Sequence, residues 1–184
     1  YKISSEDSLS DGKKVCEKYG VSYDIIDISP SVDAYFDNFP TDNPLQIGNK
    51  CARERMSVLY DFSVRKDALV VGTSNKSEIL IGYATQYGDA AAAILPIGEL
   101  YKSEVYRMSE MLEVPDSVLQ KAPSADLWVG QTDEDEIGVS YDELDAILYQ
   151  LVELKGERET LEKSGIKAQK IDRVLALMRQ SEFK

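Results

Sequence analysis

The hydrophobic residues of this chain follow two kinds of pattern: short continuous runs, and spacings of three or four residues. Short apolar runs rich in β-branched residues predict strands at 21–28 and 68–71, and a strand or extended segment at 90–97. Apolar residues spaced by three or four predict helices at 6–19, 29–39, 49–65, from 76 for about two turns, 100–113, 116–121, 141–155, 158–163 and 166–180. Strands that alternate with helices predict an α/β fold with a mostly parallel sheet, followed by a helical last third.

The segment 68–78, ALVVGTSNKSE, is the most informative local pattern. An apolar run stops at a glycine, three good helix-capping residues follow at 73–75, and Glu78 falls in the first turn of the next helix. Ligands of open α/β sheets bind where a strand passes into a helix, and helix starts attract anions. A carboxylate there tolerates phosphate when Mg²⁺ lies between them. The segment therefore indicates either a nucleotide site or an ordinary strand–helix junction in which Glu78 only complements the helix dipole.

Composition narrows the function classes. The chain has 184 residues, long enough for one domain, with 21 basic and 33 acidic residues and a net charge of −12. That charge argues against a nucleic-acid partner, and the absence of a long apolar run argues against a membrane span. The sequence contains no histidine and two cysteines, Cys16 and Cys51, which excludes a zinc site or a histidine-activated nucleophile within it. We expect two buried thiols in a reducing, cytoplasmic compartment.

Three cations stand near helix starts, where the helix dipole disfavours them. Arg53 and Arg55 lie close to an expected cap at Asn49 and border apolar faces, so each needs an anionic partner, either a carboxylate of this chain or a bound acid or phosphate. Lys102 also lies in the first turn of an expected helix. A bound phosphate or an ion pair with Glu99 would explain this position equally well. The two apolar strips of helix 49–65 also suggest that one strip packs on a second subunit.

The segment 122–138 is a long loop that contains the single tryptophan, Trp128. Loops of this length often act as lids or binding loops, and Trp128 either covers a ligand or pins the loop to the core. We expect the acidic run 133–136 to be solvated, since its spacing matches no calcium loop. Neither of the common glycine-rich phosphate motifs, G-x-x-x-x-G-K-[ST] and G-x-G-x-x-G, is present.

Five motifs in order and spacing give the chain a family resemblance. They are GNKCARERM (48–56), VVGTSNKSE (70–78), GYATQYGD (82–89), PIGELYKSE (96–104) and KAPSADLWVGQTDEDEIG (121–138). Together they resemble the ammonia-dependent NAD⁺ synthetases. The resemblance implies an adenine-nucleotide alpha-hydrolase fold, a Rossmann-like doubly wound parallel sheet, in a homodimer. It implies one domain, with an α/β part at about 1–121, a lid loop at 122–138 and a helical part at 139–184.

The resemblance also implies a reaction and a set of residues. Members of this family use ATP and Mg²⁺ to adenylate the carboxylate of deamido-NAD⁺, and ammonia then displaces AMP, without a covalent enzyme nucleophile. Arg53 resembles the family's deamido-NAD⁺ contact. Thr73, Lys102 and Ser124 resemble ATP contacts, and Glu78 resembles a Mg²⁺ ligand.

The sequence departs from the family pattern in several places. Gln86, Ala93 and Phe183 stand where many members have lysine, aspartate and histidine, so dinucleotide contacts at these positions are not carried over. The family's S-G-G-x-D-S phosphate loop is absent from residues 1–184, and finding it encoded upstream would decide against a non-catalytic module. Two other functions stay open: a sister ligase that adenylates another acid, and a non-catalytic nucleotide-binding dimer module.

Overall fold

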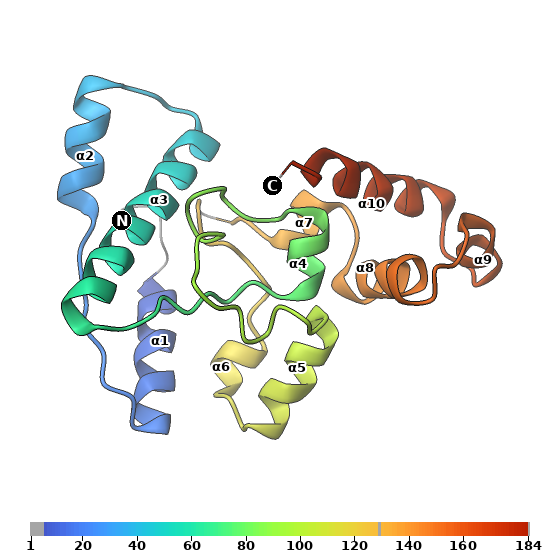
Figure 1. Ribbon diagram of the computed structural model, residues 1–184, viewed down its shortest axis with the longest axis horizontal. Helices are drawn as coiled ribbons and strands as arrows, with labels where there is room; N and C mark the ends of the chain where they lie inside the picture. The colour runs from blue at the N-terminus through green and yellow to red at the C-terminus, as the bar shows by residue number, and fades with distance from the viewer. Residues whose placement is uncertain (1–5, 129, 184) are drawn as a thin grey trace.

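A computed structural model describes residues 6–128 and 130–183, and this part of the chain is helical. The helices are α1 (Glu6–Tyr19), α2 (Ser29–Asn38), α3 (Pro44–Lys66), α4 (Lys76–Ile81), α5 (Lys102–Met111), α6 (Asp116–Leu119), α7 (Asp133–Ile137), α8 (Tyr141–Leu148), the π-helical turn η1 (Tyr149–Glu153), α9 (Arg158–Lys163) and α10 (Ala168–Ser181). Helices α1 to α3 lie at one end and α8 to α10 at the other, with α4 to α7 between them (Figure 1).

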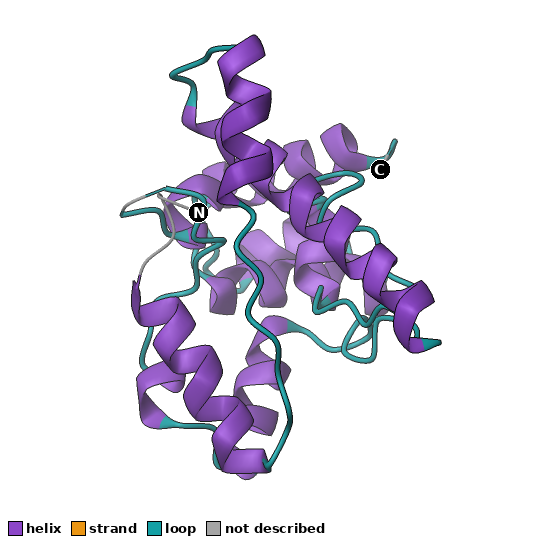
Figure 2. Cartoon of the chain, turned by 90° about the vertical axis from the view of Figure 1, so that its left-hand side faces the viewer, coloured by secondary structure: helices purple, strands orange, loops and turns teal. Residues whose placement is uncertain are grey.

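The predicted parallel sheet is wrong for the part of the chain that the structure describes. Its extended backbone pairs only at one parallel bridge, between Val71 and Ile94, where Gly72 donates its N–H to Ile94 at 2.9 Å. Figure 2, coloured by secondary structure, shows helices joined by loops. A strand is stable only when a neighbouring strand satisfies its backbone groups. A single bridge does not make a sheet, so the α/β assignment is corrected to an all-helical one.

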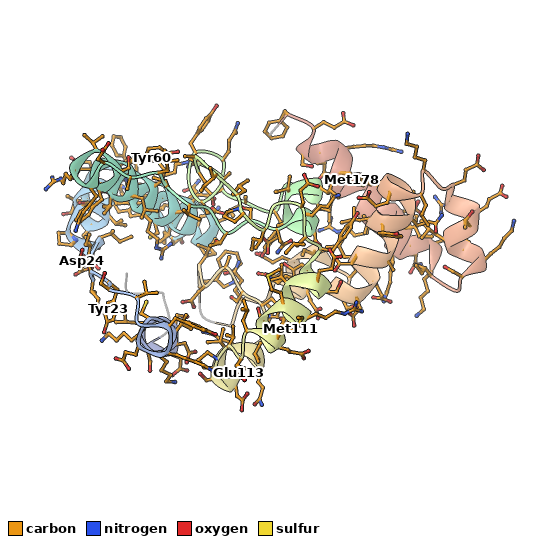
Figure 3. The ribbon with its side chains drawn as sticks, turned by 60° about the horizontal axis from the view of Figure 1, so that its bottom comes forward. Tyr23, Asp24, Tyr60, Met111, Glu113 and Met178 are labelled. Carbon is orange, nitrogen blue, oxygen red and sulfur yellow. The ribbon has the colours of Figure 1, made fainter. Side chains whose placement is uncertain are left out.

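The predicted strand at 21–28 is an extended connection between α1 and α2. Most of its apolar side chains are exposed, with Val21 at 57% and Ile25 at 56%, and only Ile28 at its end is buried, at 7%. Figure 3 shows Tyr23 and Asp24 on this connection at the edge of the molecule. The segment is rich in β-branched residues, as strands are, but no neighbouring strand is hydrogen-bonded to it within the described residues.

Two hydrophobic clusters hold the helices together. The larger one joins α4, α7, α8, α9 and α10, and includes the fully buried Leu144, Ile147 and Ile171. The smaller one lies between α2 and α3 and contains Val32 and Cys51. Burial raises the pKa of the Cys51 thiol. Cys16 is only half-buried, so the expectation of two buried thiols is wrong for that residue.

Helix α3 begins five residues before the sequence pattern suggested. The side-chain oxygen of Asn43 accepts the N–H groups of Leu45 and Gln46, and Pro44 occupies the first turn. Asn43 therefore caps the helix, and Asn49 lies inside it. Proline suits a first helical turn because it has no N–H to leave unpaired.

Candidate functional site

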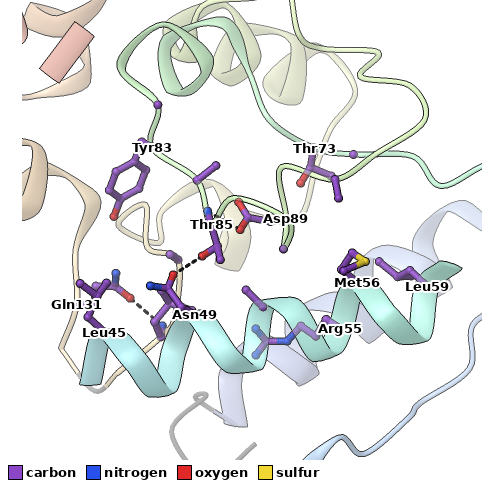
Figure 4. A pocket seen from close by; sticks show the side chains of 18 of the residues that line it. Leu45, Asn49, Arg55, Met56, Leu59, Thr73, Tyr83, Thr85, Asp89 and Gln131 are labelled. Carbon is purple, nitrogen blue, oxygen red and sulfur yellow. Dashed lines mark hydrogen bonds between the residues drawn. The ribbon is translucent and has the colours of Figure 1, made fainter. Parts of the chain in front are cut away.

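A cavity of about 720 Å³ opens between α3, the segment that follows α4, and the loop before α7. Apolar side chains of α3, including Met56 and Leu59, line one wall, and Thr85 and Asp89 line the other (Figure 4). The Thr85 hydroxyl donates to the Asn49 side chain at 2.7 Å, which fixes the segment after α4 against α3. Such a mostly apolar cavity with a few fixed polar groups is typical of a small-molecule site.

A second cavity of about 440 Å³ adjoins the first. It is lined by four residues that the sequence selected, Thr73, Glu78, Lys102 and Ser124. Four residues line both cavities and form the boundary between them: Thr73, Tyr83, Asp89 and Ala125. The two cavities therefore form one site with two chambers, and a larger and a smaller ligand group could meet at their boundary.

Glu78 and Lys102 form the charged pair of the smaller cavity. Lys102 Nζ lies 3.1 Å from Glu78 Oε1, and the two side chains are 19% and 16% exposed. The other oxygen of Glu78 accepts the N–H of Asn75 at 3.1 Å, and the Asn75 side chain accepts the N–H of Glu78. This reciprocal cap fixes the carboxylate at the start of α4. Glu99, the alternative partner of Lys102, pairs with Lys76 at 3.3 Å instead.

The acidic run 133–136 forms α7 and is only partly solvated. Asp133 is 4% exposed and accepts the hydroxyl hydrogens of Tyr83 and Tyr141, each at 3.0 Å. The single Tyr83 hydroxyl hydrogen is shared between Asp133 and Glu136, and Glu136 also accepts from the side-chain amide of Gln131. Burial raises the pKa of Tyr83 and of Tyr141, and the neighbouring carboxylates raise both further, so both phenols stay neutral. The expectation of a solvated acidic loop is therefore wrong for Asp133.

The loop at 122–138 contributes residues to both cavities. Trp128 lines the larger one, as a ligand cover would, and Ser124 lines the smaller one. The side chain of Arg173 on α10 donates to the backbone oxygens of Glu136 and Ile137, each at 2.8 Å. These bonds satisfy carbonyl groups at the end of α7 and tie the loop to the C-terminal helices.

The two arginines of α3 lie in different places. Arg55 lines the larger cavity. Arg53 is exposed and its Nε donates to the backbone oxygen of Gln86 at 3.2 Å, outside the residues that line the two cavities. The predicted deamido-NAD⁺ contact is thus separated from the four residues of the smaller cavity.

The residues present fit a magnesium ion that arrives with a nucleotide. Within residues 6–128 and 130–183 there is no group of three or more side chains suited to hold a metal by themselves. Magnesium is usually held by one or two carboxylates together with substrate phosphates. Glu78 supplies one such carboxylate at the wall of the smaller cavity.

Sequence reasoning missed several residues that line the site. Asp89, Thr85 and Tyr83 belong to the motif GYATQYGD at 82–89, but no local pattern distinguishes them from the other residues of that motif. Asp133 and Glu136 belong to the acidic run 133–136, for which the sequence predicts a solvated loop. The available signal was a run of carboxylates inside a long loop with tyrosines on either side of it in sequence.

Comparisons with known proteins agree with the family resemblance of the sequence motifs. The family model described as NAD synthase matches residues 1–184. The chain is 46% identical over 184 residues to an NH(3)-dependent NAD(+) synthetase of Trichlorobacter lovleyi, covering all of this chain and 67% of that protein. Among solved structures, an NH3-dependent NAD synthetase of Campylobacter jejuni matches with a TM-score of 0.80 and 35% identity, over 98% of this chain and 70% of that one. An NMN synthetase of Francisella tularensis matches with a TM-score of 0.86 and 33% identity, over 99% and 71%.

Proposed function

Because this chain belongs to the NAD synthase family, we propose that it takes part in the ATP-dependent amidation of deamido-NAD⁺ to NAD⁺ with ammonia. The observation that carries the proposal is the Glu78–Lys102 pair, 3.1 Å apart, in a cavity also lined by Thr73 and Ser124. One anchored carboxylate beside one ammonium suits a nucleotide phosphate that arrives with Mg²⁺.

The reaction has two transfers. A carboxylate oxygen of deamido-NAD⁺ attacks the α-phosphorus of ATP, the bond to pyrophosphate breaks, and an acyl-adenylate forms. Ammonia then attacks the acyl carbon, AMP leaves with the bonding electron pair, and a proton is released. Both steps develop negative charge on phosphate oxygens, so what they require is positioned positive charge rather than an enzyme nucleophile.

Each selected residue has a role in this scheme. Lys102 offsets the charge of the phosphates, and Thr73 and Ser124 offer hydroxyl groups to the nucleotide. Glu78 would hold Mg²⁺, and a bound Mg²⁺ would polarise the phosphate oxygens. Arg53 contacts deamido-NAD⁺ away from the nucleotide chamber, which its exposure and its absence from the lining of both cavities support.

The first experiment is an assay of the full-length gene product with ATP, Mg²⁺, ammonium and deamido-NAD⁺, following NAD⁺ and AMP. Glu78→Gln keeps a residue that can cap α4 but removes the charge, and should lower kcat at least about 100-fold. Glu104→Gln is the matched control, because Glu104 caps α5 in the same way and lines neither cavity. Equal loss of activity in both variants would show that a negative charge in a first helical turn, not metal binding, is what Glu78 provides.

A second candidate substrate is nicotinate mononucleotide, the acid that corresponds to NMN. The specific observation in its favour is the TM-score of 0.86 to the NMN synthetase of Francisella tularensis. The same assay with nicotinate mononucleotide in place of deamido-NAD⁺ separates the two. AMP release with neither acid, in a protein that binds ATP, would leave the non-catalytic binding module as the surviving function.

Assembly as a homodimer belongs to the same proposal. Helix α3 presents exposed apolar side chains, with Val64 at 82%, Leu59 at 52% and Tyr60 at 38%. Figure 3 labels Tyr60 on this helix. Such a face is typical of a surface that a second copy covers. Sedimentation of the full-length protein at micromolar concentration tests this, and a monomer would contradict it.

Helices long and apolar enough to cross a membrane are lacking in the described part of the chain.

A further inference from the structure

We propose that Tyr141 is a positioning residue for Lys102: its ring face holds the Lys102 ammonium beside Glu78, and Asp133 fixes the ring. This inference rests on the proposed role of Lys102 as an ATP contact. Tyr141 lies on α8, 39 residues beyond Lys102, and neither the sequence motifs nor the reaction scheme assign it a task.

The geometry puts a buried aromatic ring against the ammonium. Lys102 Nζ lies 5.0 Å from the centroid of the Tyr141 ring and 3.1 Å from Glu78 Oε1. Tyr141 is 4% exposed and lines neither cavity, whereas Lys102 and Glu78 both line the smaller one. An ammonium within about 6 Å of a ring centroid is attracted by the ring quadrupole, more strongly when both are shielded from water.

Lys102 needs such a support for two reasons. A lysine side chain is long and flexible, and it loses most of its rotamer freedom when it binds one phosphate group. Lys102 is also the first residue of α5, where the helix dipole repels a cation. A neutral ring that orients the ammonium before the nucleotide arrives reduces both costs.

Glu78 alone could not serve as that support during the reaction. In the proposed function its carboxylate binds Mg²⁺, and an oxygen bound to a divalent cation attracts a neighbouring ammonium less. The Tyr141 ring carries no net charge and does not compete for the metal. It is therefore the partner that still orients Lys102 when Glu78 is occupied, and it leaves the full ammonium charge available to a phosphate.

Asp133 fixes the ring that supports Lys102. Its carboxylate accepts the Tyr141 hydroxyl hydrogen, with 3.0 Å between the two oxygens, and the Tyr83 hydroxyl, whose hydrogen is shared with Glu136, lies at the same distance. Asp133 starts α7 within the loop at 122–138, which also brings Ser124 to the smaller cavity. The loop and Lys102 are thus connected through one tyrosine.

The chain contains a matched arrangement that serves as a control. Tyr101 is 6% exposed, its hydroxyl donates to Glu153 at 3.1 Å, and Lys76 Nζ lies 5.4 Å from its ring centroid. None of these three residues lines either cavity. The same chemical change at Tyr101 therefore reports the general effect of altering a buried tyrosine beside a lysine.

The experiment measures the affinity of the full-length protein for ATP by calorimetry in the presence of Mg²⁺. Tyr141 is replaced by phenylalanine and then by mono-, di- and trifluorophenylalanine, which keep the ring shape and progressively weaken its quadrupole. We expect ATP affinity to fall stepwise, by roughly 3- to 30-fold over the series. The same series at Tyr101 should leave the affinity unchanged, and the series at Tyr141 should have no effect in a Lys102→Gln background.

The outcomes separate the inference from the proposed function. Equal losses at Tyr101 and Tyr141, no loss at Tyr141, or a loss that persists in Lys102→Gln would each overturn the positioning role. A Lys102→Gln variant that binds ATP normally would overturn both the inference and the role of Lys102. A protein that makes no NAD⁺ but shows the stepwise loss at Tyr141 alone would retain the inference and reject the proposed substrate.

Discussion

Ser77 on α4 donates its hydroxyl hydrogen to the carboxylate of Asp145 on α8, 68 residues further along the chain. The second carboxylate oxygen accepts the N–H of Ser103 at 2.8 Å, and the Ser77 hydroxyl oxygen accepts the N–H of Lys102 at 2.9 Å. Asp145 is 6% exposed and Ser77 is fully buried. One buried carboxylate thereby joins the starts of α4 and α5, the two helices that carry Glu78 and Lys102.

Removing this carboxylate should destabilise the protein strongly. Asp145→Ala leaves the Ser77 hydroxyl and the Ser103 N–H without their acceptor, and should lower the free energy of unfolding by about 3 kcal/mol. Urea denaturation measures the change. Asp142→Ala is the control on the same helix, since Asp142 is exposed, and should cost only about 0.5 kcal/mol. Similar losses in both variants would show that the buried network contributes little.

The cap of α4 should matter more than the cap of α3. Asn75 is 1% exposed and accepts the N–H of Glu78 at 3.0 Å, so Asn75→Ala leaves a shielded N–H unpaired. We expect a loss of about 2 kcal/mol in thermal unfolding experiments. Asn43→Ala removes an exposed cap whose N–H groups water can reach, and should cost about 0.5–1 kcal/mol. The opposite order would contradict this account.

The same substitution should have opposite signs at two glycines. A Cβ at Gly72 would lie 2.5 Å from Leu95 Cδ2 and 2.6 Å from Ala92 Cβ. Gly72→Ala should therefore cost about 1–3 kcal/mol through overpacking. Gly12 lies in α1 with no atom within 4 Å of such a Cβ, and Gly12→Ala should stabilise by about 0.5–1 kcal/mol. Urea denaturation of the two variants tests both signs.

Acid should destabilise the contact between α8 and α10. Lys170 donates to Glu143 Oε2 at 2.6 Å, and this bond, with help from Ser140, holds the pKa of Glu143 below its usual value. A carboxyl group whose pKa is lower in the folded state stabilises the protein above its unfolded pKa of 4.5. That stabilisation is lost as the pH falls through the lower folded value.

Glu143→Gln should remove this acid-dependent part. Thermal midpoints measured from about pH 6 down to about pH 3 should fall less steeply in the variant than in the wild type, and the two curves should converge at low pH. Lys170→Met should give the same flattened curve, because it removes the partner that lowers the pKa. Curves that stay parallel throughout would contradict the assignment.

The helices show how far local sequence patterns can be trusted here. Helices α1 (Glu6–Tyr19) and α9 (Arg158–Lys163) begin and end at the predicted residues, since caps, stops and apolar spacing are local properties. Helix α3 begins at Pro44 rather than near Asn49, because the Asn43 side chain is its cap and a proline suits the first helical turn. The parallel sheet was wrong because strand stability depends on pairing with segments far along the chain, which β-branched composition alone does not provide.

For the site, the sequence by itself determined the family. It also selected four residues that line the smaller cavity: Thr73, Glu78, Lys102 and Ser124. Motifs carry that information because each one is a short run of adjacent residues. Only the tertiary structure decided the partners: Glu78 rather than Glu99 beside Lys102, and a neutral tyrosine behind the ammonium. Those choices depend on how α4, α5, α7 and α8 pack, because a charge or ring acts through space on whichever side chain the fold brings near it.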